Sequence, residues 1–317
     1  MDFARRTLIA LVCSASVVCG AASLEQKADE AAARKEMFVA GDDGWRFLPA
    51  ELRFASKLAS PDLASLTAPA IGTIADFAAQ MRKADIQLVV LPVPPKILLA
   101  GEAIGVSAEE MERMRAGWEF IMRELADHDV TVVDLLPDYA AATHESFCRR
   151  DTHWSGRGIA TAVERLLPVL QSAGIAGRQS TGRGAWTRQR IQGDLGGDPE
   201  EVELRVLRGT PRAAAAGQGP LLVLGDSHAL VFHEGGDMHA TGAGLPDQIA
   251  SATGTMPDVL GVRGSGATSS RLQLARRARA NPSYLSSKKA VIWCFAGREF
   301  TEADGWKKVP ILKAAGS

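Results

Sequence analysis

The sequence has no excess of charge of either sign, because 36 lysines and arginines stand against 37 aspartates and glutamates. A chain without a net field has nothing that would draw in nucleic acid or an anionic membrane surface over a distance. We therefore expect no nucleic-acid partner, and recognition by local groups instead. The basic run Arg276, Arg277 and Arg279 lies on a predicted helix, and its spacing is typical of a solvated face.

The sequence also lacks an apolar run that would span a bilayer comfortably. The run TLIALVCSASVV (7–18) follows two arginines and precedes the small residues of CGAAS, as in an export signal. We expect a signal peptide at residues 1–22 and a single domain at residues 23–317. The alternative is an uncleaved signal that anchors the chain to the inner membrane. Both forms predict a periplasmic or secreted protein.

Cysteine is scarce, with 4 in 317 residues. Cleavage of the signal would remove Cys13 and Cys19, and it would leave Cys148 and Cys294 in an oxidising compartment where a disulfide can persist. Such a bond would tie the segment that follows Cys148 to a late strand. Two buried free thiols explain the same residues equally well, so both states stay open on the sequence alone.

No internal repeat is present, and a chain that is 46% hydrophobic and 23% charged over 317 residues suits one large domain or two small ones. Apolar runs bounded by prolines or glycines predict buried strands. They alternate with helical patterns that start at Ser107 and Ser155, two suitable N-caps. This alternation predicts an α/β fold with a parallel sheet covered by helices on both faces. The predicted strands are IQLVVLPVPP (86–95), VTVVDLLP (130–137), PLLVLGDSHAL (220–230) and KKAVIWCFAG (288–297).

In the run PLLVLGDSHAL, Ser227 comes just after the apolar part, which ends at Leu224, at the side of the sheet where open α/β proteins bind their ligands. A serine on a sharp turn after a buried strand projects its hydroxyl outward, and its own N–H can face an oxyanion, as in a nucleophile elbow. The neighbouring Asp226 is expected to shape this turn. The string GDS alone is typical of ordinary turns, so a catalytic serine also needs a base.

The string DTHW supplies a base and a group to orient it. In an extended loop, residues two apart project to the same side, so Asp151 can reach Nδ1 of His153 while Nε2 faces Ser227. Taken alone, Asp151 would be a helix cap and His153 an ordinary loop histidine. Their occurrence together with a serine turn favours a catalytic triad.

With these motifs, the chain resembles the AlgJ/AlgX-type SGNH hydrolase-like family, which includes the alginate O-acetyltransferases. The order of the motifs, with Asp and His before Ser, looks circularly permuted relative to ordinary SGNH esterases. The resemblance implies a three-layer sandwich with a mainly parallel sheet and helices on both faces. The segments that carry it are GDDGWRFL (41–48), LVVLPVPPK (88–96), VVDLLP (132–137), RRDTHWSGRG (149–158), GDL (193–195), LGDSHAL (224–230) and VIWCFAGREF (291–300).

The resemblance implies an enzyme in which Ser227 is the nucleophile, His153 the general base and acid, and Asp151 the group that orients His153. Its expected reaction is transfer of an acetyl group to a hydroxyl of an exported polysaccharide through an acyl-serine, without a cofactor. The donor would be a small molecule or a donor protein. The alternatives are a carbohydrate acetyl esterase, or a non-catalytic glycan-binding or scaffold component of an exopolysaccharide secretion complex.

Four further residues are candidates for contacts with the substrate or the oxyanion. Arg263 and Gly264 lie in GVRGSGATSS, where glycines permit close backbone approach and the arginine can bind a sugar hydroxyl or carboxylate. Trp154 follows the predicted base, and Arg298 follows the last predicted strand. A flexible glycine loop, core packing and a sheet-edge ion pair explain these residues as well. Lys96, at the end of PVPPK, is expected to be solvated.

A competing cluster of imidazoles and carboxylates lies in SHALVFHEGGDMH. Such groups bind transition metals. Their spacing is not H-E-x-x-H, however, and the glycines break a helix that would align them, so we expect no metal site. The cluster consists of His228, His233, Glu234, Asp237 and His239.

Overall fold

The computed structural model describes residues 22–175, 183–208, 217–264, 267–303 and 305–312. The expected signal peptide, apart from its last residue, and Gly266 lie outside these ranges. None of the helices within them is long and apolar enough to cross a membrane.

Five strands form a central parallel sheet in the order β4-β3-β9-β7-β8. Four of them coincide with the four predicted apolar runs, although the run at 130–137 contributes only a two-residue strand. The parallel sheet of the expected α/β fold is therefore confirmed. The strands are β3 (Gln87–Val93), β4 (Thr131–Val132), β7 (Leu221–Gly225), β8 (Asp258–Gly261) and β9 (Ala290–Ala296).

The central strand β9 shows why these runs are continuously apolar. Val291 and Trp293 face one hydrophobic cluster, whereas Ile292 and Cys294 face a second cluster on the other side of the sheet. Every residue of β9 is buried. A strand buried on both faces needs apolar residues at every position rather than alternation.

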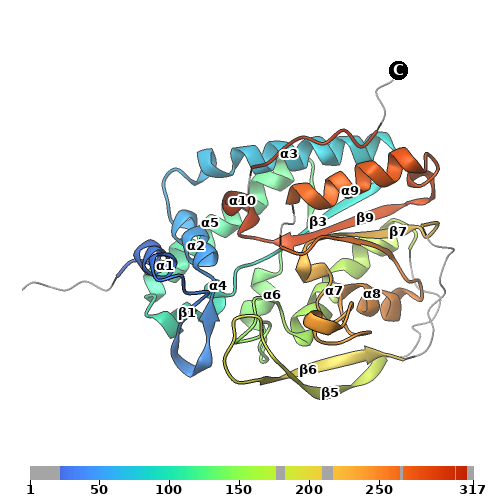
Figure 1. Cartoon of the computed structure of the whole chain (residues 1–317). Helices are drawn as coiled ribbons and strands as arrows, with labels where there is room; N and C mark the ends of the chain where they lie inside the picture. Colours follow the sequence, from blue (N-terminus) through green and yellow to red (C-terminus); the bar gives the residue numbers. More distant parts are fainter. Residues whose placement is uncertain (1–21, 176–182, 209–216, 265–266, 304, 313–317) are drawn as a thin grey trace, which may run out of the picture.

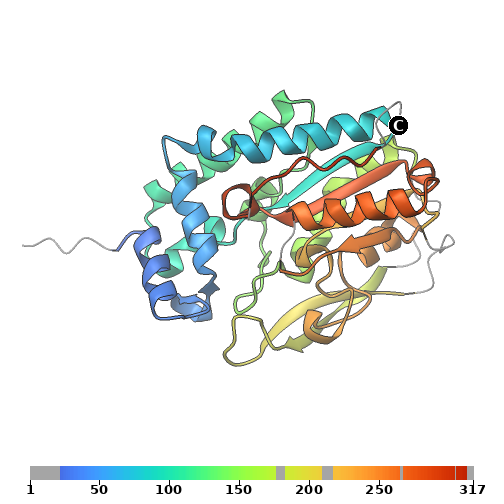
Figure 2. The same ribbon diagram turned by 45° about the horizontal axis from the view of Figure 1, so that its top comes forward.

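Helices cover both faces of the sheet, so the molecule has three layers (Figures 1 and 2). α3 (Leu63–Lys83), α5 (Ala108–Asp127) and α9 (Ala267–Ala280) supply the first hydrophobic cluster, and α7 (Gly156–Ser172) with α8 (Leu245–Thr253) supplies the second. This arrangement confirms the expected three-layer sandwich with helices on both faces of a parallel sheet. The remaining helices are α1 (Leu24–Ala33), α2 (Pro49–Leu58), α4 (Ile97–Ala100), α6 (Leu136–Ala141) and α10 (Glu299–Glu302).

The two predicted N-caps are present. The Ser107 hydroxyl accepts a hydrogen bond from the backbone N–H of Glu110 at the start of α5, at 3.2 Å. The Ser155 hydroxyl accepts one from the backbone N–H of Gly158 at the start of α7, also at 3.2 Å. Each hydroxyl satisfies one of the donors that a helix start leaves free.

Two small antiparallel sheets lie outside the central one. β1 (Val39–Ala40) pairs with β2 (Arg46–Phe47), and β5 (Arg183–Ile191) pairs with β6 (Glu200–Leu207). The sequence analysis expected neither pair. The β5–β6 ribbon lies on the α7 and α8 side of the molecule (Figure 1), and the turn between its strands reaches the segment that holds Asp151.

Candidate active site

The ends of β3, β7 and β9 meet at one edge of the sheet, where the sequence predicts the chemistry. A cavity of about 10 Å³ lies there, roughly the room that one water molecule needs. Pro94 and Lys96 line it from the end of β3, and His228 lines it from the turn after β7. Ala296 and Arg298 line it from the end of β9. Residues far apart in the sequence thus meet around one small polar space.

Ser227 begins a 3-10 helix, η3 (Ser227–Ala229), directly after β7. Neither its hydroxyl nor its N–H has a hydrogen-bond partner among the described residues. The side chain of Asp226 fixes this turn, because one carboxylate oxygen accepts from the N–H of His228 at 2.8 Å and the other from the N–H of Ala296 at 2.7 Å. The expectation that Asp226 shapes the turn is confirmed.

Asp151 and His153 are buried and hydrogen-bonded to each other. His153 Nδ1 lies 2.6 Å from Asp151 Oδ1, and the His153 N–H donates to the same oxygen at 2.9 Å. The second oxygen, Oδ2, accepts from the N–H of Asp194 and lies 2.9 Å from Nε2 of His239. All four contacts are with N–H groups or ring nitrogens, which suits an ionised carboxylate.

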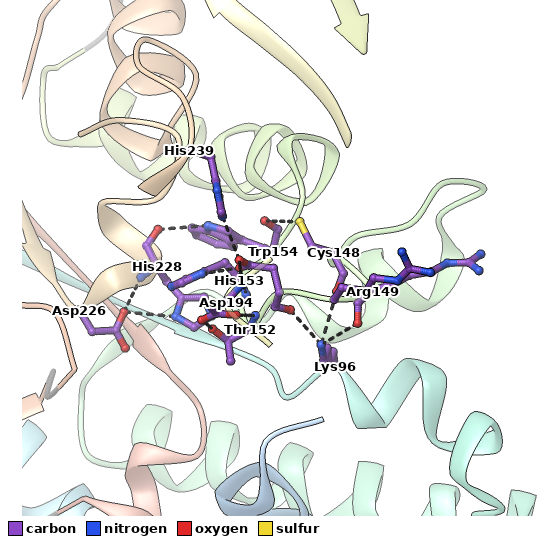
Figure 3. A network of polar contacts seen from close by, with 12 residues as sticks. Lys96, Cys148, Arg149, Thr152, His153, Trp154, Asp194, Asp226, His228 and His239 are labelled. Atoms are coloured by element: carbon purple, nitrogen blue, oxygen red, sulfur yellow. Dashed lines mark hydrogen bonds and ion pairs between the residues drawn. The ribbon is translucent and has the colours of Figure 1, made fainter. Parts of the chain in front are cut away.

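The His153 ring lies beside the turn that carries Ser227 (Figure 3). Its centroid is 4.9 Å from that of His228, the residue after Ser227. Nε2 of His153 is buried and has no hydrogen-bond partner in the described part of the chain. No hydrogen bond joins it to the Ser227 hydroxyl in this structure; contacts between base and nucleophile are often long without substrate.

The electrostatics of the pair follow from burial and hydrogen bonding. Burial alone would raise the pKa of Asp151, but hydrogen bonds with His153 and His239 hold it far below its usual range. Burial alone would lower the pKa of His153, but the Asp151 contact outweighs it and the pKa is raised. The carboxylate thus stays charged and favours the imidazolium form of His153.

Two neighbouring groups at the Ser227 turn have lowered pKa values. Burial would raise the pKa of Asp226, but His228 and the hydrogen bond from Ala296 lower it to about 2. Burial lowers the pKa of His228, so this ring stays neutral near pH 7. The His228 ring lines the cavity and packs against the rings of His153 and Trp154.

Two carboxylates of the β5–β6 ribbon and its turn accept hydrogen bonds from the loop around Asp151 (149–152), here called the Asp151 loop. The Glu200 carboxylate accepts from the N–H groups of Arg149 and Arg150, each at 2.8 Å. The Asp194 carboxylate accepts from the N–H of Thr152 at 2.7 Å and from its hydroxyl. Asp194 belongs to the GDL segment, which carried the family resemblance without an assigned role. The only sequence signal for its contribution was that resemblance.

Lys96 is buried, with 1% of its surface exposed, so the expectation of a solvated lysine is wrong. Its ammonium donates to the carbonyl oxygen of Asp151 at 2.9 Å and lies 3.4 Å from those of Cys148 and Arg149 (Figure 3). A lysine at a strand end is solvated only where nothing covers it, and here the Asp151 loop folds over its head group. Burial lowers the pKa of Lys96 in spite of nearby carboxylates, with Glu51 the main one.

Trp154 and Arg298, two of the predicted substrate contacts, differ in access to the site. Trp154 is 0% exposed, and its indole N–H donates to the carbonyl oxygen of His228 at 3.1 Å. It therefore supports the Ser227 turn from inside instead of meeting a substrate. Arg298 is partly exposed and lines the small cavity, where its charge helps to lower the pKa of Asp226.

Arg263 and Gly264, the other two, lie at the surface after β8. The Arg263 guanidinium is already paired with Glu234 at 2.6 Å and with Asp237 at 2.6 Å. The N–H groups of this guanidinium therefore already donate to carboxylates of the same protein. Gly264 has a φ of 74°, the left-handed region that favours glycine, and no atom lies within 4 Å of where a Cβ would stand.

The five residues of the histidine-rich segment do not converge on one point. His233 contacts Asp247, His239 contacts Asp151, and Glu234 pairs with Arg263, as Asp237 does. Within the described ranges, ligand atoms that could surround an ion come from Asp151, His153 and Asp194, all within 4.8 Å of one another. There the Asp151 oxygens already accept hydrogen bonds, so we interpret this set as a hydrogen-bond network.

Cys148 and Cys294 are free thiols in the structure, and both are buried. Of the two states that the sequence left open, the structure has the free one. Cys148 Sγ lies 3.7 Å from the carbonyl oxygen of Trp154, and Cys294 lies within β9. Burial raises the pKa of both thiols well above the usual value, which makes them poor nucleophiles.

Comparison with known proteins identifies the family to which the sequence is similar. Residues 38–204, just over half of the chain, match the model of an "SGNH hydrolase-like domain, acetyltransferase AlgX". Among solved structures, the chain is similar to the O-acetyltransferase domain of Pseudomonas putida AlgJ, with a TM-score of 0.61 and 18% identity over 83% of this chain and 92% of that one. It is also similar to Pseudomonas aeruginosa AlgX, with a TM-score of 0.56 and 15% identity over 86% of this chain and 66% of that one. At these identities the two structures show the fold alone. No protein with curated annotation gives a significant sequence match.

Proposed function

Since the chain belongs to the AlgX family of SGNH hydrolase-like acetyltransferase domains, we propose that it transfers acetyl groups to hydroxyls of an exported polysaccharide. Ser227 is the proposed nucleophile, His153 the base and acid, and Asp151 the group that orients His153. The observation that carries the proposal is the buried pair of Asp151 and His153, in which Oδ1 and Nδ1 are 2.6 Å apart. The other ring nitrogen of His153, Nε2, has no hydrogen-bond partner in the described part of the chain, and the ring lies beside the turn that carries Ser227. A purely structural histidine would be expected to use both nitrogens.

In the first half-reaction, the Ser227 hydroxyl attacks the carbonyl carbon of the acetyl donor and its proton passes to Nε2 of His153. The tetrahedral intermediate collapses, the bond to the donor's leaving group breaks, and the leaving group takes the proton from His153. In the second half-reaction, a sugar hydroxyl gives its proton to His153 and attacks the acetyl-serine. The acetylated sugar leaves as Ser227 regains its proton.

The N–H of Ser227 is the first proposed donor to the oxyanion, because it is free and lies at the start of η3. Arg298 is the proposed cation next to the reacting carbonyl, since it lines the cavity with His228 and its guanidinium has no hydrogen-bond partner in the described ranges. Losing one such donor typically costs about 3 kcal/mol of barrier. Arg263 and Gly264 remain proposed contacts for the polysaccharide farther out, for which Arg263 would have to exchange a carboxylate partner.

A carbohydrate acetyl esterase would use the same first half-reaction with water as the acceptor. The exclusion of water and the placement of the acceptor sugar decide between the two outcomes. A signal at the N-terminus would bring the protein to the periplasm or outside the cell, where such a polysaccharide and a secretion complex would be its partners.

The test is to incubate the purified protein with p-nitrophenyl acetate and candidate glycans, and to follow both nitrophenolate release and the mass of the glycan. Transfer adds an acetyl group to the glycan, whereas an esterase releases only acetate. Ser227→Ala should abolish both signals. Ser172→Ala, which changes an exposed serine on α7, is the matched control and should keep them. Wild-type turnover no higher than that of Ser227→Ala would support the non-catalytic binder instead.

A further inference from the structure

Asp151 is contacted by two imidazoles, and the proposed triad uses only one of them. His153 occupies Oδ1, and His239, 88 positions from Asp151 in the sequence, lies with Nε2 2.9 Å from Oδ2. The His239 side chain is only 8% exposed and that of Asp151 is 0% exposed. Figure 3 shows His239 and Lys96 at opposite ends of this network of contacts. Because the carboxylate is ionised, the short contact requires a proton on Nε2 of His239.

The backbone around His239 is arranged to hold this ring. His239 has a φ of 70°, a left-handed conformation that is unfavourable for a non-glycine residue. Hydrogen bonds from Phe232 N to Met238 O at 2.8 Å and from Gly235 N to Ala240 O at 3.0 Å close the segment on itself. The Phe232 ring lies 5.7 Å from the imidazole. Strain of this kind persists where the surroundings enforce it.

The same segment is fixed from outside by Arg263. The guanidinium pairs with Asp237 and Glu234, the two carboxylates that precede His239 in the sequence. This explains the two acidic residues of the segment that resembled a metal-binding cluster in the sequence. Their contacts join the surface after β8 to the buried carboxylate of Asp151.

From these contacts we propose that His239 is a positioning residue for the triad, which holds Oδ2 of Asp151 so that Oδ1 stays directed at Nδ1 of His153. The effect of His239 on catalysis rests on the proposed function, whereas its effect on the pKa of His153 does not. A carboxylate with donors on both oxygens cannot rotate without breaking them. The donor on Oδ2 also draws negative charge away from Oδ1, so it moderates how strongly Asp151 favours a proton on His153.

Other charged or titratable groups face His153 and must stay constant in a test. They come from the Asp151 loop, the β5–β6 turn and the turn after β7. Asp151 is the one of these groups that His239 contacts, so a change of the His239 side chain acts on Asp151 and leaves the other three in place. These groups are Asp151, Asp194, Asp226 and His228.

The test follows the titration of His153 by NMR in protein with isotope-labelled histidine, which needs no enzymatic activity. His239→Leu keeps bulk and removes the donor, and His239→Gln places an amide N–H near the position of Nε2. His233→Leu is the matched control, since His233 lies in the same segment and contacts a different buried carboxylate, Asp247, at 2.9 Å. Should His239→Leu not fold, His239→Ala takes its place.

We expect the His153 midpoint to rise by about 0.5 to 1 pH unit in His239→Leu, because Oδ2 of Asp151 then keeps only the Asp194 N–H as a donor and more of the negative charge stays on Oδ1. It should return towards the wild-type value in His239→Gln and stay unchanged in His233→Leu. With p-nitrophenyl acetate, kcat should fall about 10- to 100-fold in His239→Leu with little change in KM. An unchanged His153 midpoint in folded His239→Leu would overturn the proposal. A shifted midpoint in a protein that shows no turnover would uphold the coupling and count against the proposed function alone.

Discussion

The ammonium of Lys96 donates a 2.9 Å hydrogen bond to the carbonyl oxygen of Asp151, a residue 55 positions later in the chain. The bond joins the end of β3 to the loop that carries the proposed base. The ammonium also lies 3.4 Å from the carbonyl oxygens of Cys148 and Arg149. The loop is thus shaped around one buried cation.

Replacing Lys96 by Met should therefore lower the stability of the whole protein. The change removes the donor that three carbonyl oxygens face, and it leaves the buried Glu51 without its main opposing charge. We expect the free energy of unfolding to fall by about 2 to 4 kcal/mol, measured by urea denaturation. Lys83→Met, at an exposed position on α3, is the control and should change it by less than about 0.5 kcal/mol. Equal denaturation midpoints for the two variants would contradict the structural role of Lys96.

Asp151→Asn should abolish most activity without unfolding the protein. An amide in place of the carboxylate can donate to Nδ1 of His153 and so stabilise the tautomer with its proton on Nε2, which cannot act as a base. We expect kcat on p-nitrophenyl acetate to fall on the order of 10³- to 10⁴-fold, as in other triads. Asp62→Asn, at an exposed site, should keep wild-type activity. Retention of more than about a tenth of the activity in Asp151→Asn would argue against a triad.

The pH dependence of the activity should follow the raised pKa of His153. The base must be neutral to accept the proton of Ser227, so activity rises as pH increases through that pKa. Because Asp151 raises the pKa above the ordinary value of about 6.5, the acid limb should lie above that pH. A profile of kcat/KM against pH from 5 to 9, at roughly constant ionic strength, measures the limb. A rate that stays flat through the acid range would rule out His153 as the base.

Gly193→Ala should disturb the loop that holds Arg150 and Asp151, because Gly193 lies in the β5–β6 turn that packs against this loop. A Cβ at this position would overlap the carbonyl oxygen of Arg150, and the next residue, Asp194, donates its N–H to Asp151. We expect a loss of about 1 to 3 kcal/mol in the free energy of unfolding and a lower kcat. Gly72→Ala, where no atom lies within 4 Å of the new Cβ, lies inside α3 and should stabilise the protein by about 0.5 to 1 kcal/mol. The opposite order of the two melting temperatures would contradict this packing.

Cys148 and Cys294 should both be alkylated in protein that is denatured without a reductant. Both are free thiols, and at 1% and 0% exposure they should react slowly while the protein is folded. Mass spectrometry after iodoacetamide treatment, with and without denaturant, measures how many of the two thiols are alkylated in the denatured and in the folded protein. A mass that shows neither thiol modified in denaturant would instead indicate a disulfide.

The sequence predicts the parts of this protein that depend on local chemistry. The apolar runs predict four of the five strands of the central sheet, Ser107 and Ser155 predict the starts of two helices, and the spacing of Asp151 and His153 predicts their hydrogen bond. The helix caps and the Asp151–His153 contact join residues that are two or three positions apart. The continuous apolar runs indicate strands that are buried on both faces of the sheet.

The parts that the sequence does not predict depend on long-range contacts. Lys96 is buried because a loop more than 50 positions away covers it, and Arg263 is neutralised by carboxylates 26 and 29 positions before it. The contact of His239 with Asp151 spans 88 positions. A charged residue in isolation carries no sign of such partners, so the sequence favours solvent exposure. The family resemblance identified the segments but not their contacts.

Trp154 connects the two segments of the proposed site, which are the loop that holds Asp151 and His153 and the turn that holds Ser227. It follows His153 directly, and its indole holds the carbonyl oxygen of His228, which follows Ser227. A smaller residue at position 154 would remove this hydrogen bond and leave a cavity beside the His228 ring, so the distance between the proposed base and the proposed nucleophile depends in part on one buried aromatic side chain.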